Sequence, residues 1–168
     1  MRKLLYVAVA TLGLWQSAYA ADVVTIQQKI PFNEDAEVAG AVKRECQLEE
    51  HLSEYVAKFG NDGGLKIETA ADVSPSSANR VLVMEITGAV SDGNAFMGHH
   101  KSMSVKGKLY DGGQLVASFK AKRNSMGGAF AGFKGNCSVL DRTSKELGED
   151  IAKWLGQPKM DAMLGDLD

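Results

Sequence analysis

Apolar residues recur at helical spacing between residues 33 and 59, and most positions between them are polar or charged. Asn33 is suited to cap the start of such a helix, and the acidic residues after it suit the positive end of the helix dipole. Glycines from Gly60 onward end it. The pattern predicts a first helix over residues 33–59, with a buried stripe of Val38, Val42, Leu48, Leu52, Val56 and Phe59.

A second apolar stripe predicts a helix over residues 137–155. Ser138 and Asp141 form a short capping motif at its start, and Gly156 followed by Pro158 ends it. The buried stripe consists of Cys137, Leu140, Leu147, Ile151 and Trp154.

Three other segments have the composition of β-strands. Residues 23–28 are rich in β-branched side chains, and residues 65–69 alternate between apolar and charged ones. Residues 80–90 are apolar nearly throughout, which is typical of a central strand. Glu85 interrupts this run, and we expect it to be paired or near a strand end, because a buried carboxylate without a partner is costly.

A hairpin follows, with its turn at Asp111-Gly112-Gly113. Alternation assigns one face of the hairpin to the core and the other to lysines. The expected core positions are Met103, Val105, Gly107, Leu109, Leu115, Ala117, Phe119 and Ala121. The lysines of the other face are Lys106, Lys108, Lys120 and Lys122.

These elements give the order β-α-β-β-β-β-α. Because the antiparallel strands are grouped together, the predicted class is α+β. We expect a mostly antiparallel sheet of about five strands with the two helices packed on one face. Residues 21–156 would form a single domain, and residues 157–168 a short mobile tail.

The first 20 residues have the pattern of a cleaved signal peptide. Arg2 and Lys3 form a basic start, an apolar run follows, and Ala18 and Ala20 supply the small side chains for cleavage after Ala20. The mature chain would have 168 minus 20, or 148 residues, with a net charge of −4 from 17 basic and 21 acidic side chains. We therefore expect a periplasmic or secreted protein with no transmembrane segment after cleavage. The sequence has no cysteine near the cleavage point, which argues against a lipid anchor.

Both cysteines, Cys46 and Cys137, would reach an oxidising compartment, where disulfides form and persist. We predict a bridge between them; the alternative is two buried thiols. A bridge across 91 positions would stabilise the fold by about 4 to 5 kcal/mol in the chain-entropy model.

Two loops of similar spelling, Gly93-Asn-Ala-Phe-Met-Gly98 and Gly127-Gly-Ala-Phe-Ala-Gly132, bracket the hairpin. Because antiparallel strands meet in reverse order, residues near Lys101 should lie opposite those near Asn124, which places both loops at one end of the sheet. The candidate binding residues are Phe96, His99, His100, Lys101, Asn124, Phe130, Phe133 and Lys134. The alternative is that the phenylalanines belong to the core and the glycines permit close packing.

Between Lys101 and Lys134 there are seven basic residues and one acid, Asp111. This excess indicates a surface for an anionic envelope polymer or an acidic partner protein. The alternative is a solvated face whose lysines protect an edge strand from aggregation. Nucleic acid is not an expected partner, because the basic face lacks aromatic residues on which bases could stack.

We expect no cofactor, metal or catalytic residue. His99 and His100 are neighbours in a predicted strand, so they should point to opposite faces, and His51 is far away in the sequence. No nucleophile is accompanied by a recognisable base.

Three segments resemble small exported bacterial cell-envelope proteins of unknown function: GKLYDGGQLV from Gly107, SMGGAFAGFKGNC from Ser125 and LGEDIAKWL from Leu147. More distantly, the strand, turn, strand, glycine-rich loop and closing helix are similar to the α/β domains of envelope proteins such as the amino-terminal domain of TolB. The closer resemblance covers most of the mature chain, and the distant one its second half. Together they imply an envelope location and a binding or structural role, without catalytic residues.

The sequence thus predicts a non-enzymatic binding or protein-interaction module that uses the two loops and the basic hairpin. The alternatives are a small-molecule or anion-binding protein and, least favoured, a hydrolase.

Overall fold

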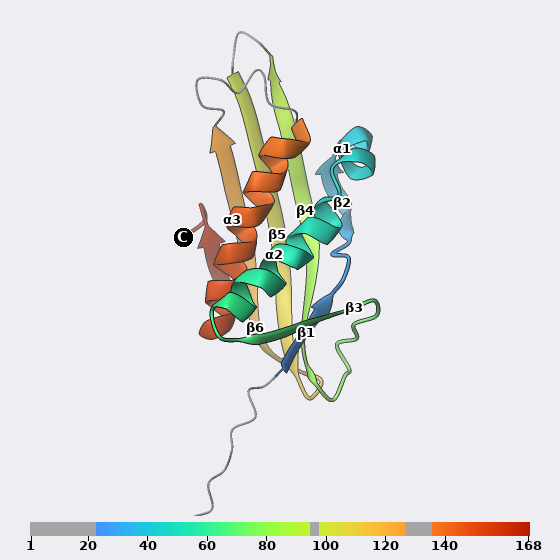
Figure 1. The fold of residues 1–168 in the computed structure, drawn as a ribbon, viewed down its shortest axis with the longest axis vertical. Helices are drawn as coiled ribbons and strands as arrows, with labels where there is room; N and C mark the ends of the chain where they lie inside the picture. The colour runs from blue at the N-terminus through green and yellow to red at the C-terminus, as the bar shows by residue number, and fades with distance from the viewer. Residues whose placement is uncertain (1–22, 95–97, 127–135) are drawn as a thin grey trace, which may run out of the picture.

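Three long strands form the centre of the fold (Figure 1). The computed structural model describes residues 23–94, 98–126 and 136–168, and within them one sheet has the strand order β3-β1-β4-β5-β6-β7, with β2 also paired to β4. The elements are, in chain order, β1 (Val23–Gln27), β2 (Phe32–Val38), α1 (Gly40–Glu45), α2 (Leu48–Asp62), β3 (Lys66–Ala70), β4 (Arg80–Asn94), β5 (Gly98–Asp111), β6 (Gln114–Met126), α3 (Asn136–Gly156) and β7 (Ala162–Gly165).

The sheet is mixed. The pairs β4–β5 and β5–β6 are antiparallel, whereas β1 and β2 run parallel to β4, β3 runs parallel to β1, and β7 runs parallel to β6. The α+β class is confirmed, but the described residues form seven strands and three helices instead of about five mostly antiparallel strands and two helices.

Helices α2 and α3 lie across the same face of the sheet (Figure 1). Their buried side chains, such as Leu52 and Ile151, pack with Met84 and Val105 of the sheet in one core cluster. Each side chain of this size stabilises the fold by about 1.5 to 3 kcal/mol when it is fully buried. The other face of the central strands has no helix over it in the described part of the chain.

The first helix is shorter than predicted, because residues 32–38 form strand β2. Hydrogen bonding to the free edge of β4 outweighs the helical spacing of this segment, as tertiary context commonly outweighs propensity. Asn33 therefore caps no helix, and its side-chain amide donates to Glu85 Oε2 at 2.7 Å. The remaining helix breaks into α1 and α2 at Gln47, whose φ of 47° is left-handed.

Gln27 joins the two strands that share one edge of β4. β1 pairs with β4 up to Leu82, and the pairing with β2 begins at Ile86. Between them, Gln27 Nε2 donates to the Met84 carbonyl at 3.0 Å, and the Met84 amide donates to Gln27 Oε1 at 2.7 Å. The side-chain amide thus replaces a backbone partner, so that no buried polar group of β4 is left unpaired there.

The hairpin alternation is confirmed except at one position. The seven other residues predicted as core are all buried. The pairing of β5 with β6 shifts between Leu109 and Tyr110, which places Leu115 opposite Tyr110. Leu115 is therefore 42% exposed, and the prediction that it is a core residue is wrong.

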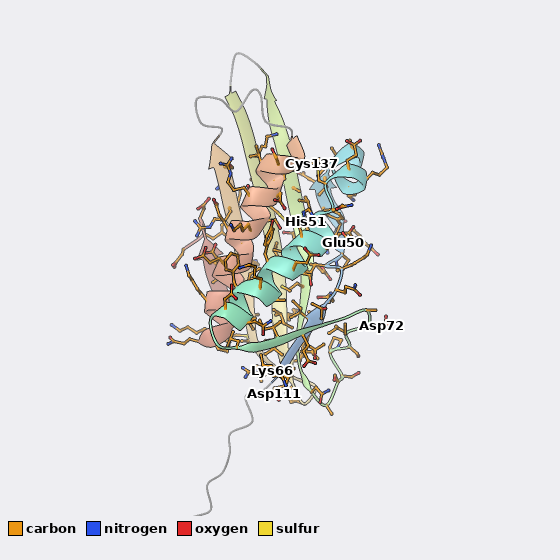
Figure 2. All side chains as sticks on the ribbon, in the orientation of Figure 1. Glu50, His51, Lys66, Asp72, Asp111 and Cys137 are labelled. Atoms are coloured by element: carbon orange, nitrogen blue, oxygen red, sulfur yellow. A yellow bond between two sulfur atoms is a disulfide. The ribbon has the colours of Figure 1, made fainter. Side chains whose placement is uncertain are left out.

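The predicted disulfide is present. Cys46 and Cys137 are bonded, and their Cα atoms lie 4.8 Å apart. Cys137 lies near the start of α3, at the end of the sheet away from the Asp111 turn (Figure 2). The bridge therefore ties α3 to the chain between α1 and α2.

The segment predicted to be a mobile tail contains strand β7, which extends the sheet beside β6. Asp166 anchors it: one carboxylate oxygen accepts from the Asn124 amide at 2.6 Å, and the other from Arg123 Nη1 at 3.1 Å. Arg123 also binds both oxygens of Asp150 in α3, at 2.7 and 2.8 Å. A single side chain thus connects the last strand, β6 and α3.

Within the described ranges, no helix has the length and apolar character needed to cross a membrane. The predicted signal peptide lies outside the described residues.

Candidate functional site

The face of the sheet opposite α2 and α3 carries the lysines of the hairpin. Cross-strand partners share a face, and Lys106 lies opposite Glu85 of β4 on one side and Lys120 of β6 on the other. Lys108 is two residues along β5 and shares their face. All three lysines are solvent-exposed. We call this surface the open face.

A groove of about 530 Å³ lies on the open face. It extends from the loop before β4, across the central strands, to the start of β7. Its lining consists of Pro75, Val83, Glu85, Lys106, Gly107, Lys108, Tyr110, Ser118, Phe119, Lys120, Asp161, Ala162 and Met163.

One lysine of the groove is neutralised within the protein. Lys106 Nζ lies 2.9 Å from Glu85 Oε2, and the same oxygen accepts from the Asn33 side chain. The hydrogen bonds from Lys106 and then from Asn33 hold the pKa of Glu85 below its usual value, because both favour the ionised carboxylate. The prediction that Glu85 is paired is confirmed.

The two other lysines of the groove keep their charge available. Lys108 and Lys120 have no ion pair among the described residues. Lys120 also lies directly opposite Lys106, an arrangement of like charges that costs a few tenths of a kcal/mol or more. Among the described residues, no acidic side chain forms an ion pair with either of these two cations, although Glu85 also attracts Lys108.

The end of the groove near the Asp111 turn is apolar. Val83 and Tyr110 project from neighbouring strands, and Pro75 of the preceding loop lies beside them. Val81, opposite Tyr110, is buried, with 2% exposure. One site thus combines a basic centre with an apolar end. The prediction that the basic face lacks aromatic residues is wrong at Tyr110, which shares that face with Lys108.

A close packing arrangement supports the groove floor from the helix side. A Cβ atom at Gly107 would overlap the ring of Phe119, its cross-strand partner. The Phe119 ring covers this glycine and meets Trp154 of α3 edge to face, with ring centroids 4.8 Å apart. Glycine is required at 107 because the aromatic ring occupies the space of a side chain, and the floor is thereby fixed to the core.

The C-terminal segment forms the rim of the groove. Ser118 Oγ donates to Asp161 Oδ1 at 2.9 Å, and Met163 lies beside Lys120 in the β6–β7 pairing. Asp161 places a negative charge at this rim. Sequence reasoning missed Asp161, Ala162 and Met163. Strand β7, which begins at Ala162, is only four residues long, too short for a recognisable alternation, and Asp161 lies directly before it.

The sequence-predicted binding residues are only partly described. Phe96, Phe130, Phe133 and Lys134 lie outside the described residues, and for His99 and His100 only the backbone, within β5, is described. The strand register pairs Asn94 with Gly98 and His100 with Met126. The strand ends that lead into the two predicted loops therefore meet at one end of the sheet.

Lys101 and Asn124 do not lie together on the open face. Lys101 alternates with Met103 toward the helix-covered face, is 2% exposed, and its burial lowers the pKa of its ammonium group. Asn124 is held by Asp166, to which its side-chain amide donates at 2.9 Å. Neither residue lines the groove.

A polar contact between α2 and α3 was also missed. His51 Nδ1 lies 2.8 Å from Asp141 Oδ1, and the Tyr55 hydroxyl lies 3.1 Å from both Asp141 oxygens. No sequence signal couples residues 86 to 90 positions apart, so only the packing of the two helices reveals this contact. In the described part of the chain, no three His, Cys, Asp or Glu side chains are grouped closely enough to hold a metal ion.

No family model and no curated protein matches this chain. Solved structures are similar in fold. The hypothetical protein CT253 from Chlamydia trachomatis has a TM-score of 0.54 at 13% identity, over 81% of this chain and 96% of that one. Protein XCC0632 from Xanthomonas campestris, of the DUF330 family model, has a TM-score of 0.51 at 10% identity, over 80% and 82%. A minor lipoprotein from Acinetobacter baumannii has a TM-score of 0.50 at 9% identity, over 83% and 95%. At these identities the likeness concerns the fold alone.

Proposed function

We propose that this protein is an exported, non-enzymatic binding protein that holds an anionic ligand in the groove of the open face. The observation that carries the proposal is the pair Lys108 and Lys120, which line a preformed groove without an ion pair in the described part of the chain. The described lining holds three lysines against two acids, Glu85 and Asp161, so the groove has a positive balance, and a positive cleft attracts anions. The rigid strands that hold both lysines reduce the cost of ordering the site.

A cell-envelope location fits this function. A signal peptide cleaved after Ala20 would direct the chain to the periplasm or the exterior, where the Cys46–Cys137 bridge is stable. One protein of similar fold is a minor lipoprotein, which supports an envelope role for this architecture. The ligand would then be a small anion, an anionic polymer or the acidic surface of another envelope protein.

A binding role agrees better with the groove than catalysis does. One hydroxyl of the groove, Ser118 Oγ, donates to Asp161, and no histidine is among the described residues that line the groove. A carboxylate alone is a weak base for activating a serine, so this pair lacks the usual equipment of a hydrolase.

The loop candidates remain a second part of the proposal. Phe96, Phe130, Phe133 and Lys134, with His99 and His100, would present a partner-binding surface at the far end of the same strands. Replacing Phe130 and Phe133 by alanine should then reduce in-cell crosslinking from this loop to its partner while the thermal unfolding midpoint stays unchanged. Unchanged crosslinking would remove the loops from the proposal.

The groove is tested with a small polyanion. At low ionic strength, tripolyphosphate should shift the backbone amide signals of β5 and β6 around Lys108 and Lys120, and K108Q/K120Q should weaken binding at least tenfold. The matched control is K66Q/K145Q, which removes the same charge from β3 and α3. Equal weakening by both double variants would mean that only net charge matters, and the groove would lose its role.

A further inference from the structure

The groove has two chemically different parts, arranged along one strand. Lys106 and Lys108 belong to its basic centre, and Tyr110 to its apolar end. At about 3.3 Å per residue, Tyr110 lies roughly 7 Å from Lys108 and 13 Å from Lys106 along β5. We propose, resting on the anion-binding function above, that the groove binds a phosphate monoester with an apolar body, the phosphate on the lysines and the body against Tyr110.

The charges at the basic centre match a phosphate monoester. Glu85 offsets Lys106 by direct contact, which leaves Lys108 and Lys120 at the centre and one acid, Asp161, at the rim. A phosphate monoester carries between about 1.5 and 2 negative charges near neutral pH. Lysine is a common phosphate ligand, and each ammonium group offers three donors.

The positions of the lysines suit one shared anion. Lys120 is the direct cross-strand partner of Lys106, and Lys108 is the next residue of β5 on the same face. Neighbours of this kind have Cβ atoms roughly 5 to 8 Å apart, a spacing that lets two long side chains converge on one phosphate. The repulsion among them falls when that anion binds.

The apolar end accounts for a body attached to the phosphate. Val83 and Tyr110 are half-buried beside Pro75, although they lie on the face without helices. A purely inorganic anion would leave this surface uncovered. A hydrocarbon or aromatic group of about 7 to 13 Å would cover it, with each buried methylene adding to the affinity.

Asp161 limits where the phosphate can lie in the groove. Its carboxylate lines the rim beside Ser118, the cross-strand partner of Lys108, and would repel a phosphate displaced toward β7. The substitution Asp161→Asn keeps an oxygen that accepts from Ser118 and removes the charge. It should therefore raise the affinity for every phosphate probe by a few-fold, opposite in direction to the lysine variants.

The experiment compares hexyl phosphate with glycerol 1-phosphate, which carries the same anion on a polar body, by calorimetry on the mature protein. Hexyl phosphate should bind at least tenfold more tightly. Y110S should remove most of this preference, Y110F should retain it, and K108Q/K120Q should weaken both probes. Thermal melts confirm that each variant is folded.

Equal affinity for the two probes would overturn this inference, while their shared dependence on the lysines would leave the anion-binding function intact. If neither phosphate monoester binds but tripolyphosphate still does, the phosphate-monoester inference is wrong and the anion-binding function stands. If no anion binds, both the inference and the anion-binding function are wrong. A preference for hexyl phosphate that Y110S leaves unchanged would place the body elsewhere and overturn the assignment.

A second arm separates the two sources of this chemistry. If the natural ligand is a lipid headgroup, the protein should sediment together with vesicles of phosphatidylcholine and phosphatidic acid. Added hexyl phosphate should compete for the groove and release the protein from these vesicles. If hexyl phosphate binds and these vesicles do not, the ligand is a soluble phosphate monoester. Vesicles of phosphatidylcholine alone are the control, and sedimentation with them would contradict phosphate recognition.

Discussion

On the helix-covered face of the sheet, Leu82, Met84 and Ile86 are fully buried, whereas Val83 and Glu85, their neighbours in β4, are only half-buried on the open face. The same alternation continues through β5 and β6, where core residues alternate with lysines. One set of strands therefore supplies both the stability of the protein and its candidate binding site.

This difference between the faces separates the effects of substitutions. Burial and the disulfide on the covered face stabilise the fold, so substitutions on that face should lower the free energy of unfolding. The open face gains little from its lysines, two of which lie opposite each other. Changes to these lysines should therefore act on the proposed ligand binding and leave the free energy of unfolding nearly unchanged.

The disulfide should give the largest effect on stability. C46S/C137S removes the link between α3 and the chain before α2. It should lower the free energy of unfolding by about 4 to 5 kcal/mol, because the unfolded chain gains conformational entropy when the loop across 91 positions is no longer closed. Urea unfolding measures the loss, and reductant should reproduce it in the wild type but have no effect on the variant. An unchanged midpoint after reduction would show that helix packing alone closes this face.

The two faces can be compared directly at adjacent residues of β4. Met84→Ala should cost about 2 to 5 kcal/mol, since it leaves a cavity at a fully buried position. Val83→Ala should cost about 1 kcal/mol or less, because the side chain is half-buried beside an open groove. Chemical denaturation of both variants checks the contrast, which would fail if Val83→Ala were the more damaging change.

Arg123 is a polar exception on the covered face. Arg123→Met should cost about 2 kcal/mol, because Asp150, only 14% exposed, loses both of its charged hydrogen bonds. Hydrogen exchange should also accelerate in β7, which Arg123 holds through Asp166. Lys122→Met, next to it on the open face, should change stability by about 0.5 kcal/mol or less. Similar effects for the two variants would mean that the Arg123–Asp150 hydrogen bonds add no stability beyond the loss of one positive charge.

The smallest effect is the pH dependence of Glu85. Its pKa is lowered in the folded protein, so its contribution is present above the unfolded value of about 4.3 and is lost as the pH falls through the lower folded value. Because the side chain is 38% exposed, Glu85→Gln should cost less than about 1 kcal/mol at pH 7. Urea unfolding should show a larger difference between the two proteins at pH 7 than at pH 3, and a difference that does not shrink as the pH falls would have another cause.

Much of the fold could be predicted where one local rule acts alone. The hairpin, the central strand, most of α3 and the disulfide all follow from alternation, helical spacing or the presence of two cysteines. Phe32–Val38 could not be predicted, because a helical spacing of apolar residues competes there with pairing to β4, which is about 50 positions away. The groove was only half predicted: its lysines follow from the hairpin, while Val83, Tyr110 and the β7 rim are brought to it by packing.

The sequence by itself determined which side chains of the hairpin face away from the core, because side chains in a strand alternate whatever their neighbours are. It also limited Glu85 to a partner or a place near a strand end, because a buried carboxylate without a partner is costly. Only the tertiary structure decided that Lys106 and Asn33 are those partners, that Lys108 and Lys120 are left without an ion pair among the described residues, and that β7 closes one side of the groove. Those outcomes depend on strand order and register, which contacts between distant segments set.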